Sequence, residues 1–204
     1  MTGSQNCNRV RQSLWEWRIC RWLYVVAVLA IVIWPVDAPS LENHSMKSNA
    51  ASYVTRVLNP GLRASGFVRH GRNWYRYGSD SILVVNIQQS RLPAVAYVNL
   101  GVYYYKYGKN ERPKIVDCHV DASLNGVVTN PLLVIGLLDL TSDIPSELRT
   151  DELANVVRAY AVPWLERMAT IDSARNFLAS NPAAAHIAPE ARVDIQVPQE
   201  ADAK

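Results

Sequence analysis

Residues 67–122 alternate between apolar and polar side chains one by one, and this pattern governs what the chain can fold into. A period of two is typical of β-strands that bury one face and expose the other. Short turn-forming segments interrupt the alternation, so consecutive strands are expected to pair antiparallel, as a meander. The predicted strands cover residues 67–70, 73–77, 81–89, 94–107 and 114–122.

Helical spacing flanks this stretch on both sides. Residues 50–64 repeat apolar side chains at helical spacing, and Gly66 follows as a stop signal. After the strands, Thr150 is a candidate N-cap for a helix that Pro163 is expected to break. Residues 131–140 are apolar and fit either a buried strand or a short helix. The prediction is an α+β fold: an antiparallel meander sheet of about five strands, with an N-terminal helix and C-terminal helices packed on it.

The chain of 204 residues divides into three predicted parts. Residues 46–180 form the α+β domain, which is large enough to bury a core of its own. Residues 181–204 are rich in Ala, Pro and Glu without periodicity, and are predicted to be disordered. Residues 1–45 form an extension whose apolar run, residues 22–36, follows four arginines. The run is short of the roughly 20 residues that span a bilayer and fits the core of an export signal better.

Two interpretations of this extension stay open. Translation that begins at Met46 would leave residues 1–45 untranslated and the protein cytoplasmic. A genuine signal would instead export the protein or anchor it in a membrane through residues 22–36. Membrane contact is therefore expected through that run only.

The composition argues against several classes of site. The domain holds one cysteine, Cys118, so an internal disulfide and a cysteine zinc site are not expected. The four histidines lack ligand-like spacing, and no glycine-rich phosphate loop opens a helix. We therefore predict no metal and no cofactor. Residues 56–114 carry ten Lys/Arg and two acids. This positive charge either neutralises the acidic second half of the domain or forms a basic face.

A series of short motifs runs through the domain in a fixed order. The motifs are Gly66-Phe67, Trp74-Tyr75-Arg76, residues 86–90, residues 97–102, Asp117-Cys118-His119 and Pro163-Trp164-Leu165. In this order they resemble the family called domain of unknown function 4304, over about residues 50–178. The resemblance implies an α+β fold and supplies no reaction, cofactor or catalytic residue.

Strand alternation selects candidate ligand-binding residues. If residues 81–89 and 94–107 form a hairpin, one face of the sheet gathers amides and phenols, which can hydrogen-bond and stack on a ligand. Gly101 on that face would let a ligand approach the backbone. The same pattern also fits an ordinary polar face. The candidates are Asn86, Gln88, Tyr97, Asn99 and Tyr103, with His119 on the next strand.

Catalysis is the competing interpretation. Asp117 and His119 would share a strand face and could orient one another in a small hydrolase or transferase, with Ser90 or Ser123 as nucleophile. Nothing in the sequence selects that nucleophile. Aromatic and basic residues also interleave, as in binders of single-stranded nucleic acid, but a pI of about 8.8 does not favour that class. The leading prediction is a non-catalytic module that binds an unknown protein or small ligand on one face of its sheet.

Overall fold

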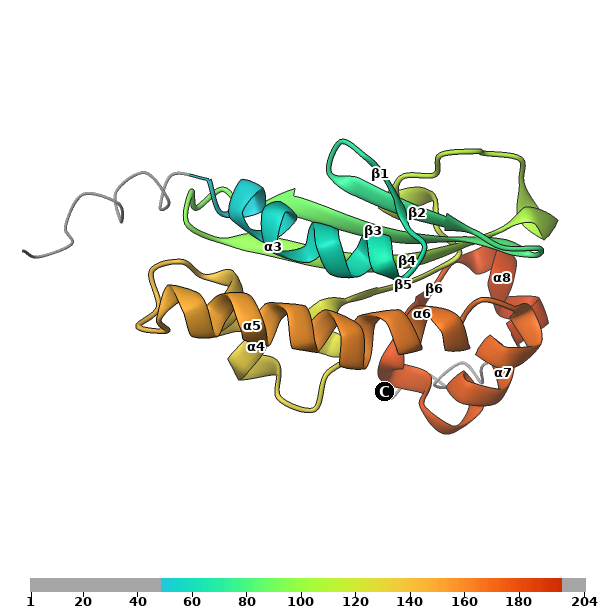
Figure 1. Cartoon of the computed structure of the whole chain (residues 1–204). Coiled ribbons are helices and arrows are strands. Elements are labelled where there is room, and N and C mark those ends of the chain that lie inside the picture. The colour runs from blue at the N-terminus through green and yellow to red at the C-terminus, as the bar shows by residue number, and fades with distance from the viewer. Residues whose placement is uncertain (1–48, 196–204) are drawn as a thin grey trace, which may run out of the picture. The chain divides into compact units, whose positions relative to one another are not determined.

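The computed structural model describes residues 49–195 of the chain (Figure 1). The predicted extension, residues 1–45 with the apolar run 22–36, lies outside the described residues, as does the last part of the predicted tail, residues 196–204. Within residues 49–195, no helix is both long enough and apolar enough to cross a membrane.

An antiparallel sheet lies at the centre of the described residues and contains six strands in chain order. The strands are β1 (Val68–His70), β2 (Asn73–Tyr77), β3 (Ser81–Gln89), β4 (Ala96–Tyr104), β5 (Val120–Ser123) and β6 (His186–Ile187). The long strands β3 and β4 form the central hairpin, in register from Ser81 opposite Tyr104 to Gln89 opposite Ala96. The predicted α+β fold with an antiparallel meander is confirmed, and β6 adds a strand to the five expected.

The main helices cover one face of this sheet, as Figure 1 shows for α4, α5 and α6. Their bounds are α3 (Ala50–Ala64), α4 (Pro131–Leu138), α5 (Ser146–Val156), α6 (Val162–Arg167), α7 (Ile171–Ser180) and α8 (Pro189–Ile195). One apolar cluster joins sheet and helices, with Trp74, Leu100 and Leu165 fully buried in it. Burial of the alternate strand positions against this layer holds the sheet in register.

The helix predicted to start at Thr150 begins earlier, at Ser146, so the N-cap prediction is wrong. The Thr150 hydroxyl instead donates to the Ser146 carbonyl oxygen (2.9 Å), one turn back inside α5. The predicted break at Pro163 is also wrong, because a π-helical turn, Val157–Ala161, joins α5 directly to α6. Proline lacks an N–H and crowds the carbonyl four residues back, and the wider π turn just before it accommodates both effects.

Only part of the predicted fifth strand is a strand. Residues Ile115–Asp117 form a 3₁₀ turn, and pairing begins at Val120. The turn lies on the sheet face opposite the main helices, where Ile115 and Cys118 pack on Val84 in a second, smaller apolar cluster. Gly101 makes this possible, because a Cβ there would lie 2.6 Å from Cys118 Sγ and 2.7 Å from Ile115 Cδ1. The sequence predicted that a ligand could approach the backbone at Gly101, but the side chains of Ile115 and Cys118 fill that space.

The prediction of disorder from residue 181 onward is wrong for residues 181–195. His186 and Ile187 add β6 to the sheet edge, where Ile187 lies opposite Val120. The following helix, α8, buries Ala191 and Ile195 in the main core. Ala191 and Ile195 are four residues apart, a helical signal too short to stand out in an Ala- and Pro-rich segment. Tertiary packing, not intrinsic propensity, stabilises so short a helix.

The ambiguous apolar segment, residues 131–140, is helix α4 followed by a turn. Asn130 caps its first turn by accepting the Leu133 N–H (3.2 Å), and Pro131 occupies the first turn. The other end of α4 is held by the side chain of Arg149, which is 3% exposed. Its guanidinium donates six hydrogen bonds of 2.7–3.1 Å, to the Ser142 hydroxyl and to the carbonyl oxygens of Gly136, Leu137, Asp139, Ser142 and Ile144.

Candidate functional site

A row of side-chain amides crosses three adjacent strands on the sheet face opposite the main helices. The backbone register places Asn73 opposite Asn86, and Asn86 opposite Asn99. Asn86 Nδ2 donates to Asn73 Oδ1 (2.6 Å), and Asn99 Nδ2 donates to Asn86 Oδ1 (3.2 Å). Asn99 Nδ2 also lies 3.4 Å from Gln88 Oε1. We call Asn73, Asn86, Gln88 and Asn99 the amide row.

The amide row keeps hydrogen-bonding capacity toward solvent. An amide offers two N–H donors and a carbonyl oxygen with two lone pairs. Among the described residues, no group donates to Asn99 Oδ1, and Asn86 uses one N–H and accepts one bond. Asn86 and Asn99 are half-buried, whereas Gln88 is exposed. The row can therefore donate to and accept from a molecule that lies on this face.

An exposed aromatic ring borders the amide row. Tyr97 lies directly opposite Gln88 and is 48% exposed. At the other edge of the row, Ser123 of β5 lies opposite Asn99 and is exposed. The predicted shared face of Asn86, Gln88, Tyr97 and Asn99 is confirmed by this register, and their role in binding stays a prediction. Asn73 was not among the predicted residues, although the alternation in its strand indicates the same face.

The other two predicted residues, Tyr103 and His119, are buried. Tyr103 lies on this face, whereas His119 precedes β5 and packs against the rings of three tyrosines. Tyr103 is 6% exposed, and its hydroxyl accepts the Asn110 N–H (3.2 Å) from the loop above it. His119 is 3% exposed and packs against Tyr103 with a ring-centroid distance of 4.6 Å. Its Nδ1 accepts the Tyr104 backbone N–H (2.9 Å), and burial lowers its pKa, so the ring is neutral near pH 7. Both side chains pack in the interior and bond to backbone N–H groups, so neither is exposed to a ligand.

The catalytic pair proposed from the sequence is not assembled. Asp117 Oδ2 accepts the Lys114 N–H (2.9 Å) and an Asn110 side-chain N–H (3.3 Å), which fixes the 3₁₀ turn. Within residues 49–195, no hydrogen bond joins Asp117 to His119, so the prediction that they orient one another is wrong. Burial raises the pKa of the Cys118 thiol, which makes it a poor nucleophile. In the part of the chain that the structure describes, no cluster of three or more metal-binding side chains exists.

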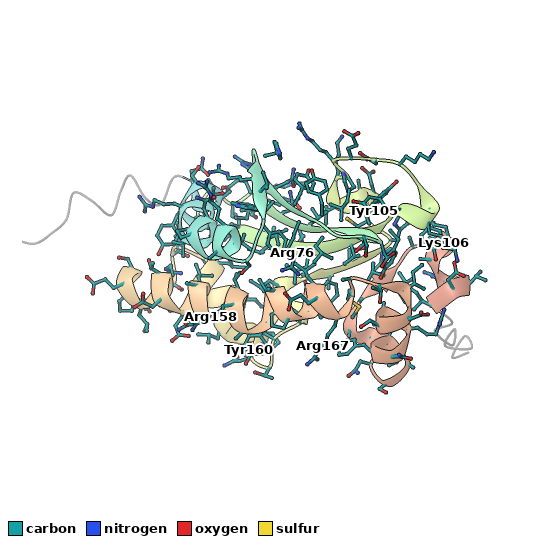
Figure 2. All side chains as sticks on the ribbon, turned by 45° about the vertical axis from the view of Figure 1, so that its right-hand side comes forward. Arg76, Tyr105, Lys106, Arg158, Tyr160 and Arg167 are labelled. Carbon is teal, nitrogen blue, oxygen red and sulfur yellow. The ribbon has the colours of Figure 1, made fainter. Side chains whose placement is uncertain are left out.

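A hollow of about 550 Å³ lies further along the same face. Its floor includes Ile82, four residues before Asn86 on β3, and the phenol rings of Tyr77 and Tyr105 line it. The loop of residues 108–112 closes one side with Lys109 and Arg112. Figure 2 shows Tyr105 beside Lys106 at this end of the sheet. Sequence reasoning missed the hollow, because residues 108–110 indicate only a turn and not the surface on which that turn folds back.

Comparison with protein families gives one informative match. The family model described as "Domain of unknown function (DUF4304)" matches residues 58–167, which is more than half of the chain. The chain belongs to this family. The match begins within α3 and ends at the last residue of α6, so it includes the amide row and the Arg149 side chain. Comparisons with curated proteins and with solved structures find no match.

Proposed function

We propose that this DUF4304 protein is a non-catalytic binding module that holds a neutral, hydroxyl-rich small ligand, such as a sugar, on the amide row. The observation that carries the proposal is the unused hydrogen-bonding capacity of Asn86 and Asn99 on an open sheet face. Amides are uncharged, and a site made of them favours ligands whose polar groups are uncharged as well. Hydroxyl groups match this chemistry because each can both donate and accept.

The spacing of the amides supports a compact ligand. Neighbouring strands lie about 4.8 Å apart, so the amides of Asn73, Asn86 and Asn99 recur at about that interval across the sheet. Hydroxyls on opposite sides of a sugar ring are separated by a similar distance. The exposed ring of Tyr97 beside Gln88 supplies an apolar surface on which the C–H face of such a ring can stack.

The surroundings of the row support binding without catalysis. Of the two candidate nucleophiles, Ser90 Oγ accepts the Leu92 backbone N–H (3.2 Å), and among the described residues neither Ser90 nor Ser123 bonds to a histidine. The candidate base, His119, is covered by tyrosine rings. No charged side chain belongs to the row. A site that lacks an activated nucleophile and a placed general base can bind a ligand but has no group to transform it.

Binding is tested by saturation-transfer NMR with the full chain and a pool of neutral mono- and disaccharides. We expect at least one sugar to bind, and Asn99→Ala to weaken that binding about tenfold, the equivalent of one lost hydrogen bond with its partner left unpaired. Asn155→Ala is the matched control, because Asn155 is an exposed asparagine on helix α5. Equal binding by both variants, or no binding by the wild-type chain, would refute the proposal.

The localisation of the module depends on where the chain starts. We propose a cytoplasmic protein if translation starts at Met46, and an exported or anchored one if residues 22–36 are translated and act as a signal. N-terminal sequencing of the native protein from separated cell fractions distinguishes these cases.

A further inference from the structure

Helix α4 carries an apolar surface that the fold does not use. All eight of its residues are apolar or glycine, a composition typical of a helix buried on every side. The fold buries only Val134, Leu137 and Leu138. Leu132 is 79% exposed and Ile135 is 51% exposed, and Leu148 on the neighbouring helix α5 is 52% exposed.

Acidic side chains predominate in the stretch of sequence that contains these side chains. Residues 131–157 contain five acids, which are Asp139, Asp143, Glu147, Asp151 and Glu152. The only base in that range is Arg149, whose guanidinium is turned inward onto backbone carbonyls. The next base along the chain is Arg158, which Figure 2 shows near Tyr160 on the helix layer.

From these two observations we propose that Leu132, Leu133, Ile135 and Leu148 form a docking surface for an amphipathic helix of a partner protein, with lysines and arginines flanking its apolar face. We call these four residues the α4 surface. An amphipathic helix presents apolar side chains at intervals of three and four residues, which pack against the ridges of an exposed pair of helices. Its basic residues would meet the acids around the α4 surface.

The α4 surface is held rigidly before any partner arrives. Asn130 caps the start of α4, and Arg149 binds the carbonyl oxygens at its end. The turn after α4 is tied to the sheet, since the Leu140 N–H donates to the Ala94 carbonyl oxygen (2.8 Å). A preorganised surface loses little conformational entropy on binding, so exposed apolar area converts more fully into affinity.

Negative charge argues against the two other occupants of an apolar patch. A second copy of the chain would bring the same acids, Glu147 and Asp151 among them, against each other across a two-fold axis. An anionic membrane surface would be repelled by the same side chains. Of these three occupants, a basic amphipathic helix is the one that complements both the apolar side chains and the negative charge.

The test uses the full chain and a fluorescent peptide of about 18 residues, with leucines at helical spacing and lysines elsewhere. The comparison peptide carries glutamate in place of every lysine. We expect the lysine peptide to bind at least about tenfold more tightly than the glutamate peptide, by fluorescence anisotropy. Equal affinities for the two peptides would overturn the proposed charge preference.

Two variants locate the binding. Leu132→Ser combined with Ile135→Ser should weaken binding of the lysine peptide about tenfold or more. Val116→Ser is the control and should leave binding unchanged, because Val116 is 82% exposed in the 3₁₀ turn on the opposite face of the sheet. Thermal unfolding by circular dichroism verifies that all variants are folded. Undiminished binding by the double variant would refute the proposal. Self-association of the wild-type chain that the double variant abolishes would also refute the proposal, because the occupant would then be a second copy. Binding to anionic vesicles that the double variant abolishes would refute it too, because the occupant would then be a membrane.

Discussion

Replacing Arg149 by methionine is expected to destabilise the protein more than any change to an exposed arginine. Arg149 has no carboxylate partner among the described residues and is satisfied by backbone carbonyls and one hydroxyl instead. Burial lowers its pKa, which reflects the cost of removing the guanidinium from water. The positive charge at the end of α4 offsets part of that cost, because the helix dipole places negative charge there.

The expected loss of stability depends on which carbonyl oxygens are left without a hydrogen-bond donor. Methionine has a similar length but donates no hydrogen bond, so the carbonyl oxygens at the end of α4 lose their partner. Each buried polar group left unpaired costs about 1–3 kcal/mol. Water can reach the acceptors nearest the surface, such as Ser142, which is half-buried. Removal of the guanidinium also removes its desolvation cost. We therefore expect a net loss of about 3–5 kcal/mol in the free energy of unfolding.

Equilibrium unfolding of the full chain in urea, followed by circular dichroism, measures this loss. Arg149→Lys keeps the charge but not the planar fork, so it should fall between the wild type and the methionine variant. Arg158→Met is the matched control, because Arg158 is exposed on the same helical run and should change stability by about 0.5 kcal/mol or less. An Arg149→Met variant that is within about 0.5 kcal/mol of the wild type would refute the reasoning.

Three further predictions concern other parts of the chain. Burial lowers the pKa of His119, so as the pH falls the unfolded state binds a proton on this ring before the folded state does. The free energy of unfolding should therefore decrease as the pH drops below about 6.5. Urea unfolding at several pH values should show a weaker pH dependence in His119→Asn. Gly101→Ala should cost about 1–3 kcal/mol in urea unfolding, because its Cβ would overlap Cys118 Sγ, whereas Gly61→Ala, with open space in α3, should stabilise by about 0.5–1 kcal/mol. A chain that begins at Met46 should unfold cooperatively in a thermal scan, and purely aggregated material from it alone would contradict this.

Local patterns in the sequence were sufficient to predict the centre of the sheet. Strands β2 and β3 were predicted with the bounds that the structure shows, because alternation fixes both the length of a strand and its buried face. The same alternation placed Asn86 and Asn99 on one face, and the register confirms it.

What the sequence did not reveal depends on contacts between distant residues. Nothing near Gly101 indicates that Cys118 and Ile115 would fill the space above it, so the buried positions of Tyr103 and His119 were not foreseen. The buried role of Arg149 was equally hidden, because its acceptors are backbone carbonyls, and carbonyls carry no side-chain signature.

Binding of a neutral hydroxyl-rich ligand to the amide row can be observed at the side-chain NH₂ signals of Asn86, Gln88 and Asn99. Heteronuclear NMR resolves these signals in the full chain while neutral mono- and disaccharides are added. If the sugar lies on the amide row, these signals shift in a saturable manner, together with the backbone signal of Tyr97. Unchanged row signals, with shifts confined to residues 108–112 around the neighbouring hollow, would contradict the proposed binding at the amide row.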